Sequence, residues 1–289
     1  MILKCLSDNY RILDKIGSGS FGEVYLTEDR KKRLYASKVE KKRNKSRLVD
    51  EYKIYECLKG IKEGIPIIYN YIETPYNNII VMELLGPNLD SKYIEMNKTF
   101  LISTILRISI DIIKLLEQIH KMGIIHRDIK PHNFLMNYGE IQNRLYITDF
   151  GLSKQYFKEK HIEFKSKRTL IGTARYASIN IHCGIEPSRR DDLESVGYML
   201  IYFMKGKLPW QGLKKDKNKN QIEKIGDIKT YTCVKKLCSG LPQSISKYIK
   251  YCKKLNFEET PNYKLLIGLF EQDAKILNIK PSYDWRIKL

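Results

Sequence analysis

Two short segments, residues 126–133 and 149–151, constrain this chain more than any other feature. The first reads His-Arg-Asp-Ile-Lys-Pro-His-Asn, and the second reads Asp-Phe-Gly. A His-Arg-Asp triplet is common by chance, but its combination with a nearby asparagine and a following Asp-Phe-Gly is not. Together the segments supply two carboxylates, an ammonium group and an amide, with a glycine that permits a sharp turn. Such a set is typical of a site that handles phosphate groups.

These residue types match the needs of phosphoryl transfer from ATP. That reaction requires an acceptor hydroxyl aimed in line and fixed counter-charge for the phosphates, with little covalent chemistry from the protein. Asp128 can serve the hydroxyl, and Lys130 adds a positive charge two residues later. Asn133 and Asp149 can ligate a metal ion. From these residues we predict a protein kinase.

Length and composition indicate an intracellular globular protein. The 289 residues, 43% of them hydrophobic, can bury a substantial core. The apolar region 101–119 is interrupted by charged residues, so we predict no membrane span and no membrane partner. The apolar stretch at the start, residues 1–6, is too short for a signal peptide and is flanked by polar residues. Six cysteines without Cys-x-x-Cys spacing suggest reduced thiols in the cytoplasm, the nucleus or both.

The net charge of +19, from 52 Lys and Arg against 33 Asp and Glu, leaves several explanations open. A nucleic-acid binder, a solvated basic surface and a preference for acidic or phosphorylated protein substrates all fit it. Biased coding DNA fits it as well. No nucleic-acid motif appears, so no specific nucleic-acid partner is predicted. The lysine-rich loop 214–219 is either a nuclear signal or a solvated loop.

A glycine-rich segment lies near the start, where residues 16–24 read Ile-Gly-Ser-Gly-Ser-Phe-Gly-Glu-Val. A lone Gly-x-Gly-x-x-Gly also occurs in dinucleotide-binding folds, where the third glycine opens a helix. Here residues 23–27 favour a strand, residues 28–33 form a charged turn, and a second strand follows at 34–40. We therefore predict a hairpin that folds over phosphates.

The second predicted strand and the helix after it supply a charged pair. The position of Lys38 in the strand allows its side chain to reach the α- and β-phosphates. Because side chains alternate along a strand, Ser37 should point away from the nucleotide. Residues 46–59 form a predicted helix with apolar residues along one side. Glu51 on this helix is the predicted ion-pair partner of Lys38.

Further along, the chain predicts a connector and a long helix. The buried strand 79–82 leads into residues 83–87, a connector between two lobes where adenine would bond to backbone groups. Residues 99–121 have the apolar periodicity of an amphipathic helix. His120 at its end is interpreted as structural. Asp192 can anchor the backbone of the 126–133 segment, or it can be a simple helix cap.

Several further motifs occur together. Residues 84–87 read Leu-Leu-Gly-Pro, 172–180 read Gly-Thr-Ala-Arg-Tyr-Ala-Ser-Ile-Asn, 188–192 read Ser-Arg-Arg-Asp-Asp, 208–213 read Leu-Pro-Trp-Gln-Gly-Leu and 257–259 read Phe-Glu-Glu. On these motifs the chain resembles the casein kinase I family of eukaryotic serine/threonine protein kinases, over nearly its whole length. Ser-Ile-Asn at 178–180 replaces the Ala-Pro-Glu of most other kinases, as it does in that family.

The resemblance implies an α+β, two-lobed protein kinase fold. It places a small antiparallel β-sheet lobe with one main helix, which binds ATP, at residues 1–85. A larger, mainly helical lobe for catalysis and substrate binding follows at residues 86–289. Together they would form one kinase domain, and we expect a monomer.

The resemblance also assigns roles to individual residues. Asp128 would accept the proton of the substrate hydroxyl, and Lys130 would steady the transferring phosphoryl group. ATP and Mg²⁺ are the implied cofactors, with Asn133 and Asp149 as metal ligands. The implied catalytic set is Asp128, Lys130, Asn133, Asp149, Lys38 and Glu51, and the implied nucleotide-binding set is Ile16, Gly17, Ser18, Gly19, Ser20, Phe21, Gly22, Glu23, Val24, Ala36, Lys38, Met82, Glu83 and Leu85.

Substrate choice follows from the same resemblance. A lysine two residues after Asp128, with Thr173 in the activation segment, indicates serine/threonine specificity. The family prefers an acidic or phosphorylated residue upstream of the target, held in a basic pocket. Arg168 and Arg175 stand at two pocket positions, but Gln221 stands at the third, although lysines at 217 and 219 are near in sequence. We therefore expect a weakened preference.

One other departure and two alternatives remain. His132 replaces the aspartate usual in the family, and we expect activity to survive because this side chain is no metal ligand there. A pseudokinase generally lacks one of the residues Lys38, Asp128 and Asp149, all of which are present. The second alternative, a basic scaffold protein associated with nucleic acid, is supported by the net charge alone. Because the chain stops where the resemblance to the catalytic domain stops, we expect no autoinhibitory extension and activity without phosphorylation of residues 149–180.

Overall fold

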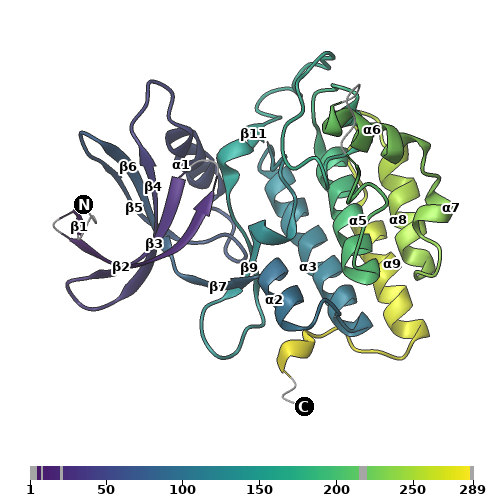
Figure 1. The fold of residues 1–289 in the computed structure, drawn as a ribbon, viewed down its shortest axis with the longest axis horizontal. Helices are drawn as coiled ribbons and strands as arrows, with labels where there is room; N and C mark the ends of the chain where they lie inside the picture. The colour runs from purple at the N-terminus through teal and green to yellow at the C-terminus, as the bar shows by residue number, and fades with distance from the viewer. Residues whose placement is uncertain (1–4, 8, 20–21, 215–219, 287–289) are drawn as a thin grey trace. The chain divides into compact units, whose positions relative to one another are not determined.

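The computed structural model describes residues 5–7, 9–19, 22–214 and 220–286 (Figure 1). The chain divides into two compact units. Unit 1 comprises the residues up to Pro87 together with Leu135–Gly151, and unit 2 comprises Asn88–Phe134 and the residues from Leu152 onward. The sequence-based division predicted two lobes, residues 1–85 and 86–289, each a continuous stretch of chain. In the structure, unit 1 also contains the separate segment Leu135–Gly151.

Unit 1 is built on an antiparallel sheet with the strand order β1-β2-β3-β4-β6-β5. Alternating apolar residues in the central strands and a charged turn between β3 and β4 produce this meander. The strands are β1 (Cys5–Ser7), β2 (Tyr10–Gly19), β3 (Gly22–Asp29), β4 (Leu34–Lys41), β5 (Ile68–Glu73) and β6 (Asn77–Glu83).

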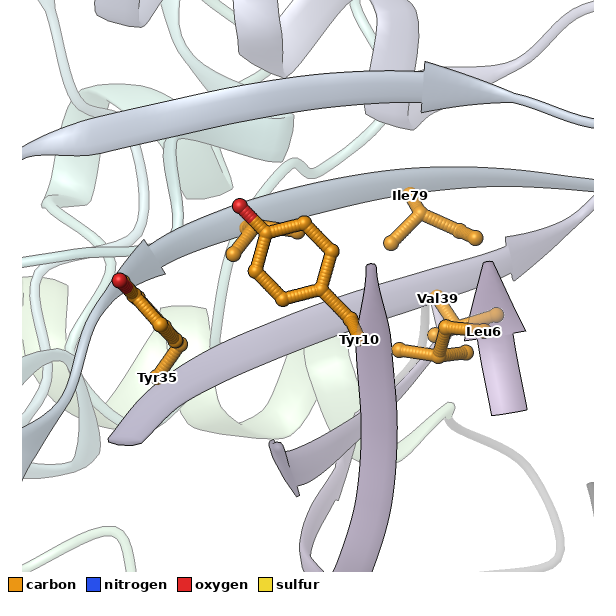
Figure 2. Close-up of a cluster of buried hydrophobic side chains, with 6 residues drawn as sticks. Leu6, Tyr10, Tyr35, Val39 and Ile79 are labelled. Atoms are coloured by element: carbon orange, nitrogen blue, oxygen red, sulfur yellow. The ribbon is translucent and has the colours of Figure 1, made fainter. Parts of the chain in front are cut away.

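The sheet register separates two faces. Val39 pairs with Ile79, and both side chains join a buried cluster with Leu6, Tyr10 and Tyr35 (Figure 2). Because side chains alternate along a strand, Ala36 and Lys38 of β4 point to the opposite face. Burial of the cluster therefore fixes which β4 side chains remain for a functional site.

Ser37 lies on the same face of β4 as the apolar cluster, as alternation predicts. Its hydroxyl is buried and lies 2.7 Å from the Thr27 hydroxyl, so each oxygen has a partner within the sheet. A buried hydroxyl is costly only when it is left without such a partner. The polar residue in this strand is therefore compatible with a stable sheet.

Helix α1 (Arg47–Leu58) follows β4 and confirms the helix predicted from residue 46. The Ser46 side chain accepts a hydrogen bond from the Val49 N–H, a typical helix start. The carboxylate of Glu40 accepts from the N–H groups of Arg47 and Leu48, each at 3.2 Å. Strand β4 therefore fixes the beginning of the helix that carries Glu51.

A second, three-stranded sheet in unit 1 has the order β10-β9-β7. Its strands are β7 (Leu85–Asn88), β9 (Phe134–Asn137) and β10 (Leu145–Ile147), and the ends of β7 and β9 extend just past the unit boundary. The predicted connector at residues 83–87 thus runs partly as a strand. This pairing brings residues 135–151 into unit 1.

Unit 2 is mainly helical. Helix α3 packs against α5 and α9, and α5 packs against α8, which buries the apolar face predicted for residues 99–121. A two-stranded sheet joins β8 (Ile124–Ile125) to β11 (Lys154–Gln155). The helices are α2 (Leu89–Glu95), α3 (Ile102–Lys121), α4 (Ile179–His182), α5 (Arg189–Lys205), α6 (Gln221–Tyr231), α7 (Val234–Leu237), α8 (Gln243–Lys254) and α9 (Tyr263–Ile276).

The antiparallel sheet with its helix and the helical second unit confirm the predicted α+β class. Within the described part of the chain, no helix has both the length and the apolar character needed to cross a lipid bilayer.

Candidate active site

In unit 1, Lys38 bridges two carboxylates. Its ammonium nitrogen lies 2.6 Å from Glu51 Oε2 and 2.8 Å from Asp149 Oδ1, so the predicted pairing of Lys38 with Glu51 is present. Burial would lower the pKa of Lys38, but the two carboxylates outweigh burial and hold this pKa above its ordinary value. The lysine is therefore fixed in its charged form.

Asp149 has an unusual backbone. Its φ is +66°, in the left-handed region that costs energy for a residue with a side chain. The next residue, Phe150, is buried and packs edge-on against Tyr55 of α1, with ring centroids 5.1 Å apart. The anchored phenylalanine holds the chain in place, and the strained turn directs the Asp149 carboxylate toward Lys38.

The face of the sheet opposite the apolar cluster carries several predicted nucleotide-binding residues. Val24 of β3 is the register partner of Lys38, and Met82 of β6 is the register partner of Ala36. Directly paired residues of antiparallel strands lie on one face. The structure therefore brings Val24, Ala36, Lys38 and Met82 to the same surface of unit 1.

Other predicted nucleotide-binding residues have different surroundings. Ile16 of β2 is 48% exposed. The Glu83 carboxylate accepts hydrogen bonds from the Tyr146 hydroxyl and the Ile67 N–H, so its side chain has a structural role. Glu23 is engaged by Lys15 and Tyr25. Leu85 is half-buried at the start of β7, and Ser20 and Phe21 lie outside the described residues.

The glycine-rich segment forms the end of the β2–β3 hairpin, as predicted, with Gly19 paired to Gly22. A Cβ at Gly22 would lie 2.3 Å from the Val39 carbonyl oxygen, so the fold itself requires glycine there. Among the described residues, a Cβ at Gly19 would meet no atom within 4 Å, and one at Gly17 would make only ordinary contact with Val24. Packing against the described residues therefore does not explain the first two glycines.

In unit 2, Asp128 is held by two neighbours. The Lys130 ammonium lies 2.6 Å from Asp128 Oδ2, and the Thr173 hydroxyl donates to Asp128 Oδ1 at 2.7 Å. The side-chain amide of Asn133 donates to the Asp128 carbonyl oxygen at 2.8 Å. Asp128 is only 6% exposed. Its carboxylate is thus fixed in one orientation beside a lysine and a threonine hydroxyl.

Asp192 anchors the segment that carries Asp128, which confirms the first of the two predicted roles. Its carboxylate accepts from the N–H groups of His126 and Arg127, each at 2.8 Å. His120 lies 3.0 Å from the same carboxylate and 2.7 Å from the Tyr263 hydroxyl, in line with its predicted structural role. Burial alone would raise the pKa of Asp192, but these hydrogen bonds hold it below its ordinary value.

Arg127 connects this loop to residues 152–173, which follow it in unit 2. Its φ is +67°, and its side chain donates to the Leu152 carbonyl at 2.6 Å. A Cβ at Gly172 would lie 2.3 Å from the Arg127 carbonyl oxygen, so only glycine permits this approach, and Gly172 has a φ of +83°. The close contact positions the next residue, Thr173, to reach Asp128.

Glu186 is a functional candidate that the sequence reasoning missed. Its buried carboxylate lies 2.8 Å from the Lys154 ammonium, 3.1 Å from the Arg168 guanidinium and 3.9 Å from that of Arg127. One carboxylate thus gathers three cations, one of which was predicted for the anion pocket. Its sequence neighbours gave no signal of this arrangement, because the three cations come from separate segments of the chain.

The other predicted pocket residues lie elsewhere. The guanidinium of Arg175 lies over the rings of Tyr176 and Tyr202, with centroids at 5.7 and 5.9 Å. Gln221 is the exposed first residue of α6. The lysines at 217 and 219 lie outside the described residues. The structure therefore gives Arg168 and Arg175 different partners.

His132 occupies an exposed position. Its side chain is 58% exposed, and its Nε2 lies 3.5 Å from the Asp90 carboxylate of α2. The neighbouring Asn133 is buried and points to the Asp128 backbone instead. The histidine at position 132 therefore faces α2, and the hydrogen bond from Asn133 to the Asp128 carbonyl is present beside it.

The described residues contain no cluster of three or more His, Cys, Asp or Glu side chains arranged for a metal ion. Asp149 and Asn133 offer a carboxylate and an amide oxygen, which are donor types that Mg²⁺ accepts. The two residues belong to different units, Asp149 to unit 1 and Asn133 to unit 2.

The comparison with family models agrees with this chemistry. The model described as the protein kinase domain matches residues 10–267 of the chain. The match includes the glycine-rich hairpin, the Lys38 ion pair, the Asp128 loop and the activation segment.

Proposed function

Because the chain belongs to the protein kinase domain family, we propose that it is an active serine/threonine kinase similar to casein kinase I. It transfers the γ-phosphoryl group of ATP to serine or threonine in acidic or pre-phosphorylated proteins. Family membership supports a phosphotransferase that uses ATP. The serine/threonine specificity, the substrate class and the individual residue roles are the proposal.

The arrangement around Asp128 carries this proposal. In the proposed role, Asp128 orients the acceptor hydroxyl and takes its proton, while Lys130 offsets charge on the transferring phosphoryl group. The hydrogen bond from Thr173, at 2.7 Å, ties the activation segment to this carboxylate. Lys130 and Thr173 beside Asp128 are the features that favour serine/threonine acceptors over tyrosine.

Unit 1 supports the ATP-binding part of the proposal. Lys38, fixed in its charged form between Glu51 and Asp149, is suited to bind phosphate oxygens. No described residue would contact a Cβ at Gly19, and a glycine there would let a phosphate approach the backbone closely. A pseudokinase would have no need of all these groups together.

The residues present also fit magnesium. Each unit offers one candidate ligand, Asp149 in unit 1 and Asn133 in unit 2, and the side-chain oxygen of each suits the ion. When bound, magnesium neutralises charge on the phosphates. Asp149 is held by Lys38, and Asn133 is held by the Asp128 backbone, so both side chains are oriented in advance.

A direct assay tests the function. Purified protein incubated with labelled ATP, magnesium and casein should incorporate label into serine and threonine of casein. The Asp128→Asn variant serves as the control for background. If nucleotide binds but casein is not labelled above this control, the chain is a nucleotide-binding protein without catalysis.

Substrate preference yields a specific prediction. On one peptide with phosphoserine, aspartate or alanine upstream of the target, Gln221→Lys should raise the phosphoserine-to-alanine ratio of kcat/KM by up to about fivefold. Exposed ion pairs contribute about 0.2–1 kcal/mol, which sets this limit. Arg175→Ala should flatten the ratio.

The matched control for these variants is Lys247→Ala, which removes an exposed charge from α8 and should leave the ratio unchanged. An unchanged ratio in Gln221→Lys would mean that residue 221 does not face the upstream residue, and the assignment of this position would be wrong.

A second prediction concerns activation. The Glu186 carboxylate forms ion pairs with Arg127, Lys154 and Arg168. In kinases activated by phosphorylation, a phosphate group pairs with basic side chains and orders the loop in the same way. Treatment with phosphatase, followed by its removal, should therefore leave the rate within about twofold of a mock-treated sample. A large loss would show that a phosphate in residues 149–180 is required.

A further inference from the structure

Lys229 is a buried lysine that the chemistry described so far does not use. It lies in α6, is 1% exposed, and its ammonium nitrogen donates to the carbonyl oxygens of Ala174 at 2.8 Å and Ala177 at 2.5 Å. Both carbonyls belong to the segment that follows Thr173. A helix remote in sequence thus holds the backbone next to Asp128.

The surroundings of Lys229 contain aromatic rings in place of an ion-pair partner. The ammonium lies 5.0 Å from the ring centroids of both Tyr198 and Trp210. Among the described residues Lys229 forms no ion pair, and the nearby Glu194 carboxylate accepts from the Tyr198 hydroxyl instead. A buried ammonium is costly unless it is well hydrogen-bonded. The two carbonyls and two rings are what hold the charge here.

The same segment is held at further points. Trp210 Nε1 donates to the Arg175 carbonyl at 2.7 Å, and His182 Nε2 lies 3.1 Å from the Ala174 carbonyl. Within the segment, the N–H groups of residues 176 and 177 donate to the Thr173 carbonyl at 2.9 and 3.0 Å. A continuous series of hydrogen bonds therefore runs from Lys229 through this turn to Thr173, whose hydroxyl donates to Asp128.

We propose that Lys229 is a positioning residue that fixes residues 173–177 against α6, and thereby sets both the Thr173–Asp128 contact and the affinity for the acceptor peptide. The inference rests on the proposed kinase function. Lys229 touches no reacting atom, and its effect passes through the backbone of the segment. It should act on peptide binding and turnover and leave ATP binding alone, because the residues proposed to hold the nucleotide belong to unit 1.

Lys229 also makes this contact sensitive to pH. Burial lowers its pKa to about 7, with the Glu194 charge acting in the opposite direction. The other groups that face it are Tyr198, whose pKa is raised by burial, and His182, whose pKa burial lowers to about 4. Near neutral pH, therefore, Lys229 is the group of this set that titrates.

The consequences for pH have a definite sign. Above about pH 7 the neutral amine keeps N–H donors but loses the charge-assisted part of both hydrogen bonds, so the KM for peptide should rise. In the unfolded chain the lysine keeps its proton up to its ordinary pKa. The unfolded state thus binds more protons between the two values, and the contribution of this group to stability increases with pH there.

Hydrogen–deuterium exchange tests the contact without relying on activity. In Lys229→Met, the amides of residues 176 and 177 should exchange at least about tenfold faster than in the wild type, since the loss of one charge-assisted hydrogen bond corresponds to about that factor. Lys92→Met is the matched control. It removes another buried lysine of unit 2, which pairs with Glu95 in α2 and should leave these amides unchanged. Unaltered exchange in Lys229→Met overturns the proposal.

Kinetics test the consequence for the reaction. Lys229→Met should lower kcat/KM for peptide by about 10–100-fold, the factor expected for one to two such hydrogen bonds. The KM for ATP should stay within about twofold. Lys229→Gln keeps an uncharged N–H donor and should be intermediate, and neither variant should show the rise of peptide KM near pH 7.

The outcomes separate the two proposals. If exchange accelerates but the peptide constants and pH profile match the wild type, Lys229 does not position the acceptor and the inference fails. If the wild-type protein phosphorylates no peptide, the proposed function fails while the exchange result still decides whether Lys229 fixes the segment. Should Lys229→Met not fold, the same comparisons are made with Lys229→Gln.

Discussion

Replacing Asp128 with asparagine is expected to lower turnover on casein by about 10²–10⁴-fold, the usual contribution of a positioned base. Asparagine has nearly the same shape and keeps one oxygen that can accept from Thr173. It cannot take a proton from the acceptor hydroxyl, and it removes the negative charge beside Lys130. The fold and nucleotide binding should be nearly intact, because the residues proposed for ATP binding lie in unit 1.

The measurement is steady-state turnover, with thermal unfolding and nucleotide affinity as checks on folding. Asp111→Asn is a matched control. Asp111 of α3 also accepts two hydrogen bonds in unit 2, from Arg107 at 2.7 Å and from the Tyr283 hydroxyl at 2.6 Å, but it has no place in the proposed chemistry. Wild-type turnover in a folded Asp128→Asn variant would remove Asp128 from the mechanism.

Contacts with a local pattern were predictable from sequence. The alternation in β4 separates Lys38 from the apolar cluster, and the helix that carries Glu51 begins at a serine cap. The choice of Glu51 as the partner of Lys38 came from the kinase pattern, which requires one acid on this helix. The hairpin of the glycine-rich segment followed from the strand-forming residues after its third glycine.

Contacts that depend on distant packing were not predictable. Glu186 gathers cations from three separate segments, and its sequence neighbours give no sign of this. Lys229 is one of many lysines in a strongly basic chain. Its signal was subtle: it lies one helical turn after Gly226, which is also buried, so a lysine stands at an inward position of α6. The return of residues 135–151 to unit 1 likewise depends on pairing between β7 and β9, which lie far apart in sequence.

Replacing Asp149 with alanine should also lower turnover strongly, because two parts of the proposed site depend on this carboxylate. The carboxylate is proposed as a magnesium ligand, and it is also one of the two anions that hold Lys38. Without it, both the metal site and the phosphate-binding lysine lose their preorganisation. The loss of one preorganised charged group typically lowers turnover by about 10²–10³-fold, so we expect a fall of that size or more.

Two measurements separate the metal role of Asp149 from its structural role. Turnover on casein should stay near background across a magnesium titration, and nucleotide affinity, measured by calorimetry, should lose the magnesium dependence that the wild type shows. Glu73→Ala removes an exposed carboxylate from β5 of the same unit, where it pairs with Lys42, and should behave as the wild type in both experiments. If Asp149→Ala is folded and its affinity for nucleotide still rises with magnesium as in the wild type, the ion is held elsewhere and the ligand assignment is wrong. If only turnover is lost, the charge of Asp149 matters chiefly for orienting Lys38, and the carboxylate belongs to the phosphate-binding part of the site.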